Sequence, residues 1–274
     1  MKRLLIIALS ILLVACTPPP EATPLQVILV SSDFALAEAR LSFALYDGTE
    51  VATNVTAVSL SAYPVGEEVS APTWRGEATN YSDYLIPYWV AYPDLPEPGF
   101  WGFIADITLD DGRSLQSQLT IDLQAESKSP ALGTIAPASQ NRTLATEPDI
   151  TKLNSGVDAN PAFYQMTVAE AIASGRPTIV GFITPGLCQT QWCAPVLESV
   201  AAVRDNIGDE AANFLHIEVY EDFQNLTVVK EMAEWGLDTE PWVFVLAEDG
   251  RVTAKFNGPL SPQELTTALN AVLQ

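Results

Sequence analysis

The sequence predicts an all-β domain followed by an α/β domain, and three observations lead to this prediction. Residues 25–125 contain short runs rich in β-branched and aromatic residues, separated by turn formers. From residue 161 onward, strand-like runs alternate with amphipathic helical stretches. Between them, residues 126–160 lack a periodic apolar pattern and are rich in Pro, Ser, Asn, Thr and Ala, as in a linker. We therefore expect a β-sandwich over 25–125 and an α/β layer domain over 161–274.

The N-terminus has the pattern of an export signal. Lys2 and Arg3 form a basic start, and residues 4–14 form an apolar stretch that is too short to span a bilayer. The sequence LVAC ends this stretch at Cys16, and a Pro-rich segment, TPPPEATP, follows it. The order of these elements predicts that the chain is exported.

The LVAC sequence resembles the lipobox of bacterial lipoprotein signal peptides. This resemblance implies that residues 1–15 are removed, that lipid (palmitate included) is attached to Cys16, and that residues 16–24 form a tether. It also implies a lipid anchor in the cell membrane or the outer membrane, with the protein on the extracytoplasmic side. The alternative is an ordinary secretory signal in which the cysteine is incidental.

The composition is strongly acidic. The chain has 34 Asp and Glu against 13 Lys and Arg, which gives a formal net charge of −21. Such a surface repels polyanions, so nucleic acid and anionic lipid headgroups are not expected as partners. Because 48% of the residues are hydrophobic and 6 are Trp, the chain is not a disordered acidic protein.

The β domain is predicted from six strand-like runs: LQVILV, ARLSFALY, AVSLSAY, YLIPYWVAY, FWGFIADITL and LQSQLTIDL. The last two flank a DDG turn and predict a hairpin. With this number of short strands, residues 25–125 resemble an immunoglobulin-like domain, and the resemblance is to the fold alone. We expect the aromatic residues of one region to fill the core rather than to form a binding platform. These residues are Tyr81, Tyr84, Tyr88, Trp89, Tyr92, Phe100 and Trp101.

The elements of the α/β domain follow in order. Thr167 and Glu170 have the spacing of a capping box at a helix start, and the strand PTIVGFIT comes next. After a loop that contains two cysteines come a helix (APVLESVAAVRDNI), a strand (FLHIEVYE) and a helix (LTVVKEMAEWG). A strand–turn–strand unit, PWVFVLAEDGRVTAKFNG, precedes a final helix capped by Ser261.

This order of elements resembles the thioredoxin family over residues 161–274. The stretch WGLDTEPWVFVLAEDGRVTAKFNGPLSPQELTTALNAVL has the family's aromatic-Gly-hydrophobic step, a proline at the cis-proline position, a hairpin, a later glycine and a last helix. The resemblance implies a thioredoxin-like fold for this domain. The positions that carry it are Trp235, Gly236, Leu237, Pro241, Asp249, Gly250 and Gly258, with Phe182 and Pro195 upstream.

The loop TPGLCQTQWCAP contains Cys188 and Cys193. An exported protein can keep a disulfide, and two cysteines so close in sequence suggest one local bridge. The family's motif is Cys-x-x-Cys, whereas the spacing here is Cys-x-x-x-x-Cys. By location, the resemblance implies that Cys188 attacks a disulfide, because a helix N-terminus stabilises a thiolate, and that Cys193 resolves the mixed disulfide.

The resemblance also implies a substrate groove beside the cysteines. Pro241, if cis, would leave a neighbouring backbone edge free for an extended peptide. Glu240 precedes it, and its negative charge would oppose thiolate formation at Cys188. We expect Trp192 and Trp242 to pack around the pair and to limit access of water.

The predicted function is therefore thiol–disulfide exchange by a membrane-anchored oxidoreductase that acts on exported proteins. A second thiol protein would supply electrons, and neither a cofactor nor a metal is expected. The main alternative is a non-enzymatic adaptor in which the Cys188–Cys193 bridge is a structural staple.

Two further functions are less favoured. The stretch TPGLCQTQWC resembles the Thr-Pro-Gly-Cys and Cys-x-x-x-x-Cys pattern of peroxiredoxins with a nearby resolving cysteine, which would imply a peroxidase. However, Leu187 is inserted before the cysteine, the loop from Phe182 is too short, and no activating arginine is close in sequence. A copper-binding protein would need ligands besides the cysteines. His216 is the chain's single histidine, lies in a strand-like run, and is not accompanied by a methionine-rich segment.

Overall fold

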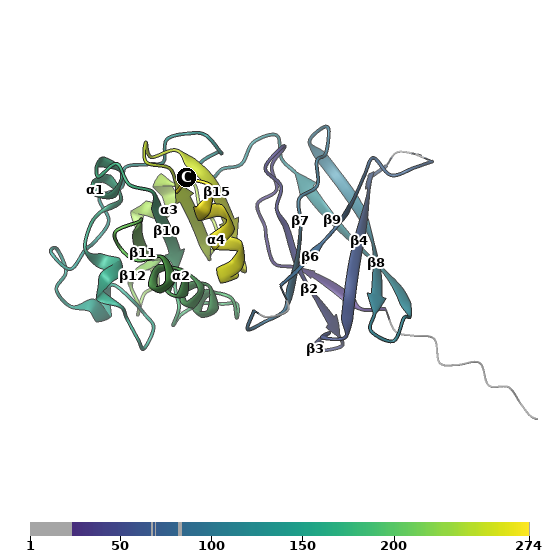
Figure 1. Cartoon of the computed structure of the whole chain (residues 1–274), viewed down its shortest axis with the longest axis horizontal. Helices are drawn as coiled ribbons and strands as arrows, with labels where there is room; N and C mark the ends of the chain where they lie inside the picture. Colours follow the sequence, from purple (N-terminus) through teal and green to yellow (C-terminus); the bar gives the residue numbers. More distant parts are fainter. Residues whose placement is uncertain (1–23, 67, 69, 82–83, 274) are drawn as a thin grey trace, which may run out of the picture.

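The computed structural model describes residues 24–66, 68, 70–81 and 84–273 (Figure 1). The predicted signal peptide, the predicted lipid attachment site Cys16 and the predicted tether up to residue 23 lie outside the described residues. The described part of the chain is mostly β-sheet with few helices. None of the helices in that part is long and apolar enough to cross a membrane.

Two antiparallel sheets form the N-terminal β unit, residues 24–124 (Figure 1). The first sheet has the order β1 (Gln26–Leu29), β2 (Leu41–Asp47), β7 (Tyr88–Ala91) and β6 (Thr79–Tyr81), and β3 (Glu50–Val51) pairs with β2. The second has the order β5 (Trp74–Glu77), β4 (Val55–Pro64), β8 (Gly99–Leu109) and β9 (Ser114–Leu123).

One hydrophobic cluster lies between these two sheets. It contains Phe43 from β2, Leu60 from β4 and Phe103 from β8, all of them buried. The predicted hairpin is confirmed, because β8 pairs with β9 along its length. The turn between them places Gly112 at φ 82°, in the left-handed region that favours glycine.

The expectation that the crowded aromatic residues fill the core is correct for only part of the set. Tyr84, Tyr88, Trp89 and Trp101 are buried. Phe100 is 61% exposed and Tyr92 is 58% exposed. Phe100 neighbours the buried Trp101 along β8, and the period of two in a strand turns neighbouring side chains to opposite faces.

A four-stranded sheet forms the centre of the C-terminal unit, residues 161–273. Its order is β11 (Asn213–Glu218), β10 (Thr178–Ile183), β14 (Trp242–Leu246) and β15 (Val252–Asn257). β10 and β11 are parallel, and the other pairs are antiparallel. A small hairpin of β12 (Tyr220–Asp222) and β13 (Thr227–Val228) follows β11.

Helices cover both faces of this sheet. Alternate side chains of β10 point to opposite faces and enter two separate hydrophobic clusters. Ile179 faces α2 (Cys193–Ile207) and α4 (Pro262–Asn270). Phe182 faces α1 (Val168–Ala173) and α3 (Lys230–Glu234). The remaining helical elements of the described residues are the short 3-10 helices η1 (Ile150–Lys152) and η2 (Pro161–Tyr164).

Local signals fix where the helices begin. The capping box predicted for α1 is confirmed: Thr167 Oγ1 accepts from the N–H of Glu170, and the Glu170 carboxylate accepts from the N–H of Thr167. Ser261 caps α4 through one bond, in which its Oγ accepts from the N–H of Glu264 at 3.1 Å. The helix expected from LTVVKEMAEWG is shorter than predicted. Its β-branched start forms β13 instead, since such residues favour strands.

The outer face of the first sheet of the β unit packs against the C-terminal unit. Every residue of β7 is buried, because the core covers one face of the strand and the C-terminal unit covers the other. The buried ion pair of Arg40 and Glu264 joins the two units. Figure 1 accordingly shows α4 on the side of the C-terminal unit that faces β7.

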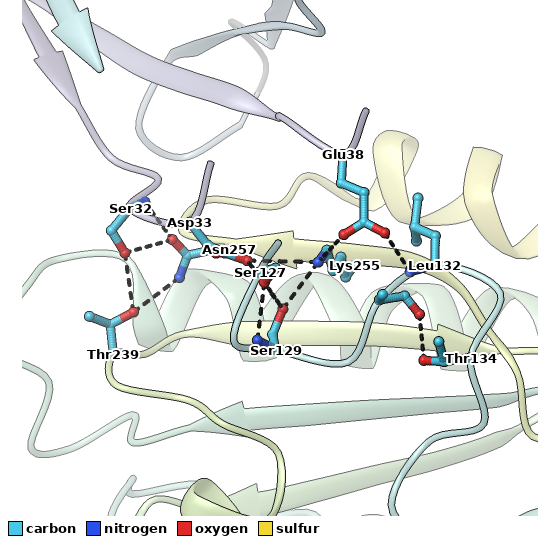
Figure 2. Close-up of polar contacts among 11 residues, drawn as sticks. Ser32, Asp33, Glu38, Ser127, Ser129, Leu132, Thr134, Thr239, Lys255 and Asn257 are labelled. Carbon is cyan, nitrogen blue, oxygen red and sulfur yellow. Dashed lines mark hydrogen bonds and ion pairs between the residues drawn. The ribbon is translucent and has the colours of Figure 1, made fainter. Parts of the chain in front are cut away.

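A second polar network crosses the same boundary (Figure 2). Lys255 of β15 has a side chain that is only 7% exposed, and its Nζ lies 2.6 Å from the Glu38 carboxylate and 3.7 Å from that of Asp33. Nearby, Asn257 Oδ1 accepts from the N–H of Ser32 at 2.6 Å. The buried charge is therefore paired with acids of the other unit, which ties the units together.

Candidate redox site

Cys188 and Cys193 form a disulfide at the start of α2. The two sulfurs are 2.03 Å apart and the Cα atoms 6.0 Å apart, so the local bridge expected from the spacing is present. Cys193 is the first residue of α2 and is fully buried. Cys188 lies in the preceding loop and is partly exposed. Of the two cysteines, only Cys188 therefore has surface that a molecule from outside can contact.

The N-terminus of α2 gives the site a favourable potential for a thiolate. The helix has 15 residues, its N-cap residue Trp192 makes no side-chain capping bond, and its first turn contains no acidic residue. The uncapped N–H groups and the aligned peptide dipoles place partial positive charge beside both sulfurs. Cys188 Sγ also lies 3.2 Å from Thr190 Oγ1. After reduction, these contacts favour the ionised form of the thiols.

Pro241 lies at the start of β14, and the peptide bond between Glu240 and Pro241 is cis. The Pro241 carbonyl accepts from the N–H of Gly258 at 3.0 Å, so this side of the loop is occupied. Among the described residues, the backbone N–H and C=O of Glu240 bond to no other residue. A short unpaired backbone edge therefore lies next to the cysteines, where an extended peptide can pair.

Glu240 brings negative charge to the disulfide. A carboxylate oxygen of this residue and the sulfurs of Cys188 and Cys193 all lie within 4.8 Å of one another. Burial raises the pKa of the Glu240 carboxyl, and the nearby charge of Glu218 raises it further. No basic group of the described residues offsets this effect on the carboxyl. The ionised carboxylate opposes formation of a second anion on either sulfur.

Glu218 was not recognised from the sequence as part of this site. It ends β11, is 3% exposed, and accepts from the N–H groups of Ser155 at 2.8 Å and Val219 at 2.9 Å. The signal was present in FLHIEVYE, because a carboxylate within an apolar strand needs partners when it is buried. Its position beside Glu240 depends on strand pairing and could not be read from sequence.

The two tryptophans of the predicted groove have different surroundings. Trp192 enters a cluster on the outer face of the β unit with Ala44, Tyr88 and Val90, and its ring meets Tyr88 edge-on at 6.4 Å between centroids. Trp242 is buried and stacks on Phe244 at 5.4 Å. That they limit water at the disulfide stays a prediction.

The β unit contacts the disulfide loop directly, which the sequence did not indicate. Besides the Trp192 contact, Gln191 Nε2 donates to Tyr46 Oη at 2.9 Å. These two loop residues immediately precede Cys193 and are separated from their partners by more than a hundred positions. The β unit therefore holds the half of the loop that leads into α2.

His216 is a packed residue. It is buried, its Nε2 lies 2.7 Å from the Ile183 carbonyl, and its Nδ1 lies 2.5 Å from Tyr164 Oη. Burial lowers the pKa of the ring. Both nitrogens have partners, and His216 is not in the donor group formed by the cysteines and Glu240. Neither ring nitrogen of His216 is therefore free to bind a metal ion.

A cavity of about 410 Å³ adjoins the loop on the side of α2. It lies between residues 154–160 and the helix, and two of its lining residues are close in sequence to the cysteines: Gly186 and Ala194. This hollow offers room for a side chain of a bound molecule next to the disulfide. Its lining also includes Ser155, Phe163, Pro185, Leu197 and Glu198.

No family model and no curated protein matches the chain. A thiol:disulfide interchange protein of the thioredoxin family from Chlorobium tepidum TLS is 15% identical with a TM-score of 0.29, over 43% of this chain and 100% of that chain. CopC from Methylosinus trichosporium OB3b is 12% identical with a TM-score of 0.26, over 36% of this chain and 94% of that chain. At these values, neither likeness carries an argument about function.

Proposed function

We propose that this protein is a thiol–disulfide oxidoreductase whose residues 161–274 form a thioredoxin-like domain, preceded by an immunoglobulin-like sandwich of residues 25–125. The observation that carries the proposal is the position of the disulfide. The disulfide of the partly exposed Cys188 lies at an uncapped helix N-terminus, next to a cis-proline loop with a free backbone edge.

In the reducing direction, the thiolate of Cys188 attacks one sulfur of a substrate disulfide, and the other substrate sulfur leaves as a thiolate that takes a proton. Cys193 then attacks the Cys188 sulfur, which releases the second substrate thiol and forms the Cys188–Cys193 bond. The substrate gains two electrons and two protons, and the protein dithiol loses them. A second thiol protein restores the dithiol by the same exchange.

The N-terminal sequence supports a location and a class of substrate for the proposed enzyme. The LVAC stretch supports a lipid anchor on Cys16 and a place on the extracytoplasmic side of the cell membrane or the outer membrane. Exported proteins with thiols or disulfides are then the accessible substrates. An extended segment of such a protein would pair with the backbone of Glu240 and place a side chain in the cavity beside Gly186.

The test is a redox titration of the protein from Thr17, which keeps all described residues and lacks Cys16. The protein is equilibrated in graded glutathione buffers, alkylated and weighed intact. A reversible transition between roughly −270 and −120 mV supports exchange, whereas a bridge that stays closed below about −300 mV supports a staple. With a scrambled model substrate, Cys188→Ser abolishes exchange, and Cys193→Ser accumulates the mixed disulfide.

A structural staple is the second candidate, and one observation favours it. The loop is fastened to the β unit through Gln191 and Trp192, so a bridge between Cys188 and Cys193 also stabilises the contact between the two units. If this is its role, the Cys188→Ser and Cys193→Ser variants lose stability to the same extent, and neither one traps a substrate.

A further inference from the structure

The group formed by Cys188, Cys193 and Glu240 has a second chemical capacity. Two sulfurs and one carboxylate oxygen lie within 4.8 Å of one another. In the disulfide the sulfurs are bonded to each other and are poor ligands. Reduction converts them to two thiols, which lose their protons to solvent when they bind a metal ion. The oxidised protein therefore contains the donor atoms of a metal site, but in the disulfide they cannot bind a metal ion.

The spacing suits a tetrahedral ion once the bridge is opened. Zinc binds thiolates at about 2.3 Å and carboxylates at about 2.0–2.2 Å, which places two thiolate sulfurs about 3.8 Å apart. The Cα atoms of Cys188 and Cys193 are 6.0 Å apart, so rotation of the Cys188 side chain is sufficient to separate the sulfurs. Glu240 is already within reach of both. A water or a substrate thiolate supplies the fourth ligand.

The charges around the group favour a cation. Among the described residues, Glu240 forms no ion pair with a Lys, Arg or His; the nearby charged group that affects it is another carboxylate, Glu218. Glu218 is buried, with only 3% of its surface exposed, and backbone N–H groups hold its carboxylate in place. A divalent ion between two thiolates and Glu240 neutralises this charge, which no side chain of the described residues does.

We propose that the reduced protein binds one Zn²⁺ ion through Cys188, Cys193 and Glu240. Binding forms two zinc–thiolate bonds and releases the two thiol protons; the disulfide is opened beforehand by a thiol or phosphine reductant, which is itself oxidised. The proposal does not depend on exchange activity, because it requires only the reduced pair. While the ion is bound, the Cys188 sulfur cannot attack a disulfide, so zinc inhibits the exchange proposed above.

The carboxylate distinguishes zinc from copper(I). Copper(I) prefers soft thiolate and thioether ligands, whereas zinc also accepts carboxylate oxygen. Met166 and Met232 pack in a hydrophobic cluster, and both ring nitrogens of His216 are occupied. Glu240 therefore strengthens the binding of zinc and contributes little to copper(I).

The experiment uses the protein from Thr17, reduced with a phosphine and desalted without oxygen. Zinc is titrated in competition with a chromophoric chelator, and native mass spectrometry counts ions per chain. We expect one ion per reduced chain, none for the oxidised protein, and release of two protons for each zinc ion at a pH where both thiols are protonated. Glu240→Gln should weaken zinc binding at least tenfold and leave copper(I) affinity within about twofold.

Glu221→Gln is the matched control, because Glu221 is exposed on β12 and does not belong to the donor group. This variant should bind zinc as the unaltered protein does. Each variant is first shown to form its disulfide in air and to give the circular dichroism of the unaltered protein, so a misfolded variant is recognised. Absence of zinc uptake, equal affinity of Glu240→Gln, or one ion shared by two chains would each overturn the proposal.

These outcomes are independent of the redox titration. If zinc binds and the disulfide stays closed below about −300 mV, the metal site holds and the exchange function fails. If exchange occurs and zinc does not bind, the exchange function holds and the metal site fails.

Discussion

Arg40 and Glu264, 224 positions apart in the chain, form a buried bidentate ion pair across the boundary between the two units. Arg40 Nε and Nη2 each lie 2.8 Å from an oxygen of the Glu264 carboxylate. The hydroxyls of Tyr88 and Tyr92 donate to the same carboxylate at 2.9 and 2.8 Å. All four donors belong to the β unit, so the buried charge of α4 is satisfied only when the two units are in contact.

The first prediction concerns this ion pair. Arg40→Met removes two of the four donors and leaves a buried carboxylate without a countercharge. We expect a loss of about 3–5 kcal/mol in the free energy of unfolding. Urea unfolding followed by tryptophan fluorescence measures this loss. Arg113→Met is the control, because Arg113 pairs with Asp111 at the exposed β8–β9 turn; it should leave stability nearly unchanged. Equal effects of the two substitutions would contradict the role of the pair.

The second prediction concerns the close approach between the backbone of Gly258 in the C-terminal unit and that of Val30 in the β unit. A Cβ at this position would lie 2.6 Å from the Val30 carbonyl oxygen, and φ is 85°. Gly112 has nearly the same φ, 82°, but nothing within 4 Å of a Cβ. Both Gly→Ala substitutions therefore strain the backbone, and only Gly258→Ala also forces the units apart.

We expect Gly258→Ala to cost about 1–3 kcal/mol more than Gly112→Ala, since overpacking of a tight contact has this magnitude. Thermal and urea unfolding of the two variants measure the difference, and the shared backbone strain cancels. If both variants lose the same stability, the close contact between Gly258 and Val30 does not contribute to the packing of the two units.

What the sequence predicts well is local. The β8–β9 hairpin, the capping box at Thr167 and the disulfide each depend on residues close in the chain, where turn chemistry, capping and loop length act directly. The α3 prediction failed at its start for a related reason. Apolar and β-branched residues there fit both a strand and a helix, and pairing with β12 decided between them.

What the sequence does not predict is how the units meet. The burial of every residue in β7 indicates a strand covered on both faces, but not by what. The contact of Trp192 with Tyr88, and the approach of Glu218 to Glu240, join elements whose distance in space depends on the whole topology. The candidate site was therefore foreseen in its cysteines and cis-proline loop, while its acidic surroundings and its support by the β unit were not.

The third prediction tests that support. Trp192→Ala removes a buried indole from the Tyr88 cluster, which should cost about 3–5 kcal/mol of stability. It also frees the loop between Cys188 and Cys193. Closing a freer loop loses more entropy, so the disulfide becomes less favourable and the reduction potential rises. A rise of about 20 mV corresponds to roughly 1 kcal/mol.

Glutathione equilibration of Trp192→Ala measures the potential, with Trp74→Ala as the control. Trp74 packs against Phe103 in the core of the β unit, away from the loop. The Trp74→Ala substitution should lower the stability of the protein and leave the reduction potential of the disulfide unchanged. If neither variant changes the potential, the β unit does not influence the redox site.

The fourth prediction is a pH dependence that originates at His216. Its Nε2 faces the Ile183 carbonyl, and Tyr164 Oη, which accepts from Asn154 Nδ2, lies at its Nδ1. The neutral ring with a proton on Nε2 fits both contacts, because it donates to the carbonyl and accepts from the hydroxyl. Burial lowers the pKa of His216, and the charge of Glu218 offsets this only in part.

Because the pKa of His216 is lower in the folded protein than in the unfolded chain, the unfolded chain takes up a proton first as the pH falls. The stabilising contribution is complete above about pH 6.5 and is lost toward the folded-state pKa, with a slope of at most about 1.4 kcal/mol per pH unit. His216 is the chain's one histidine. Urea unfolding between pH 7.5 and 5 should show this slope, and His216→Gln, which keeps a donor and an acceptor but does not titrate, should flatten it. Parallel profiles for the two proteins would show that His216 is not its source.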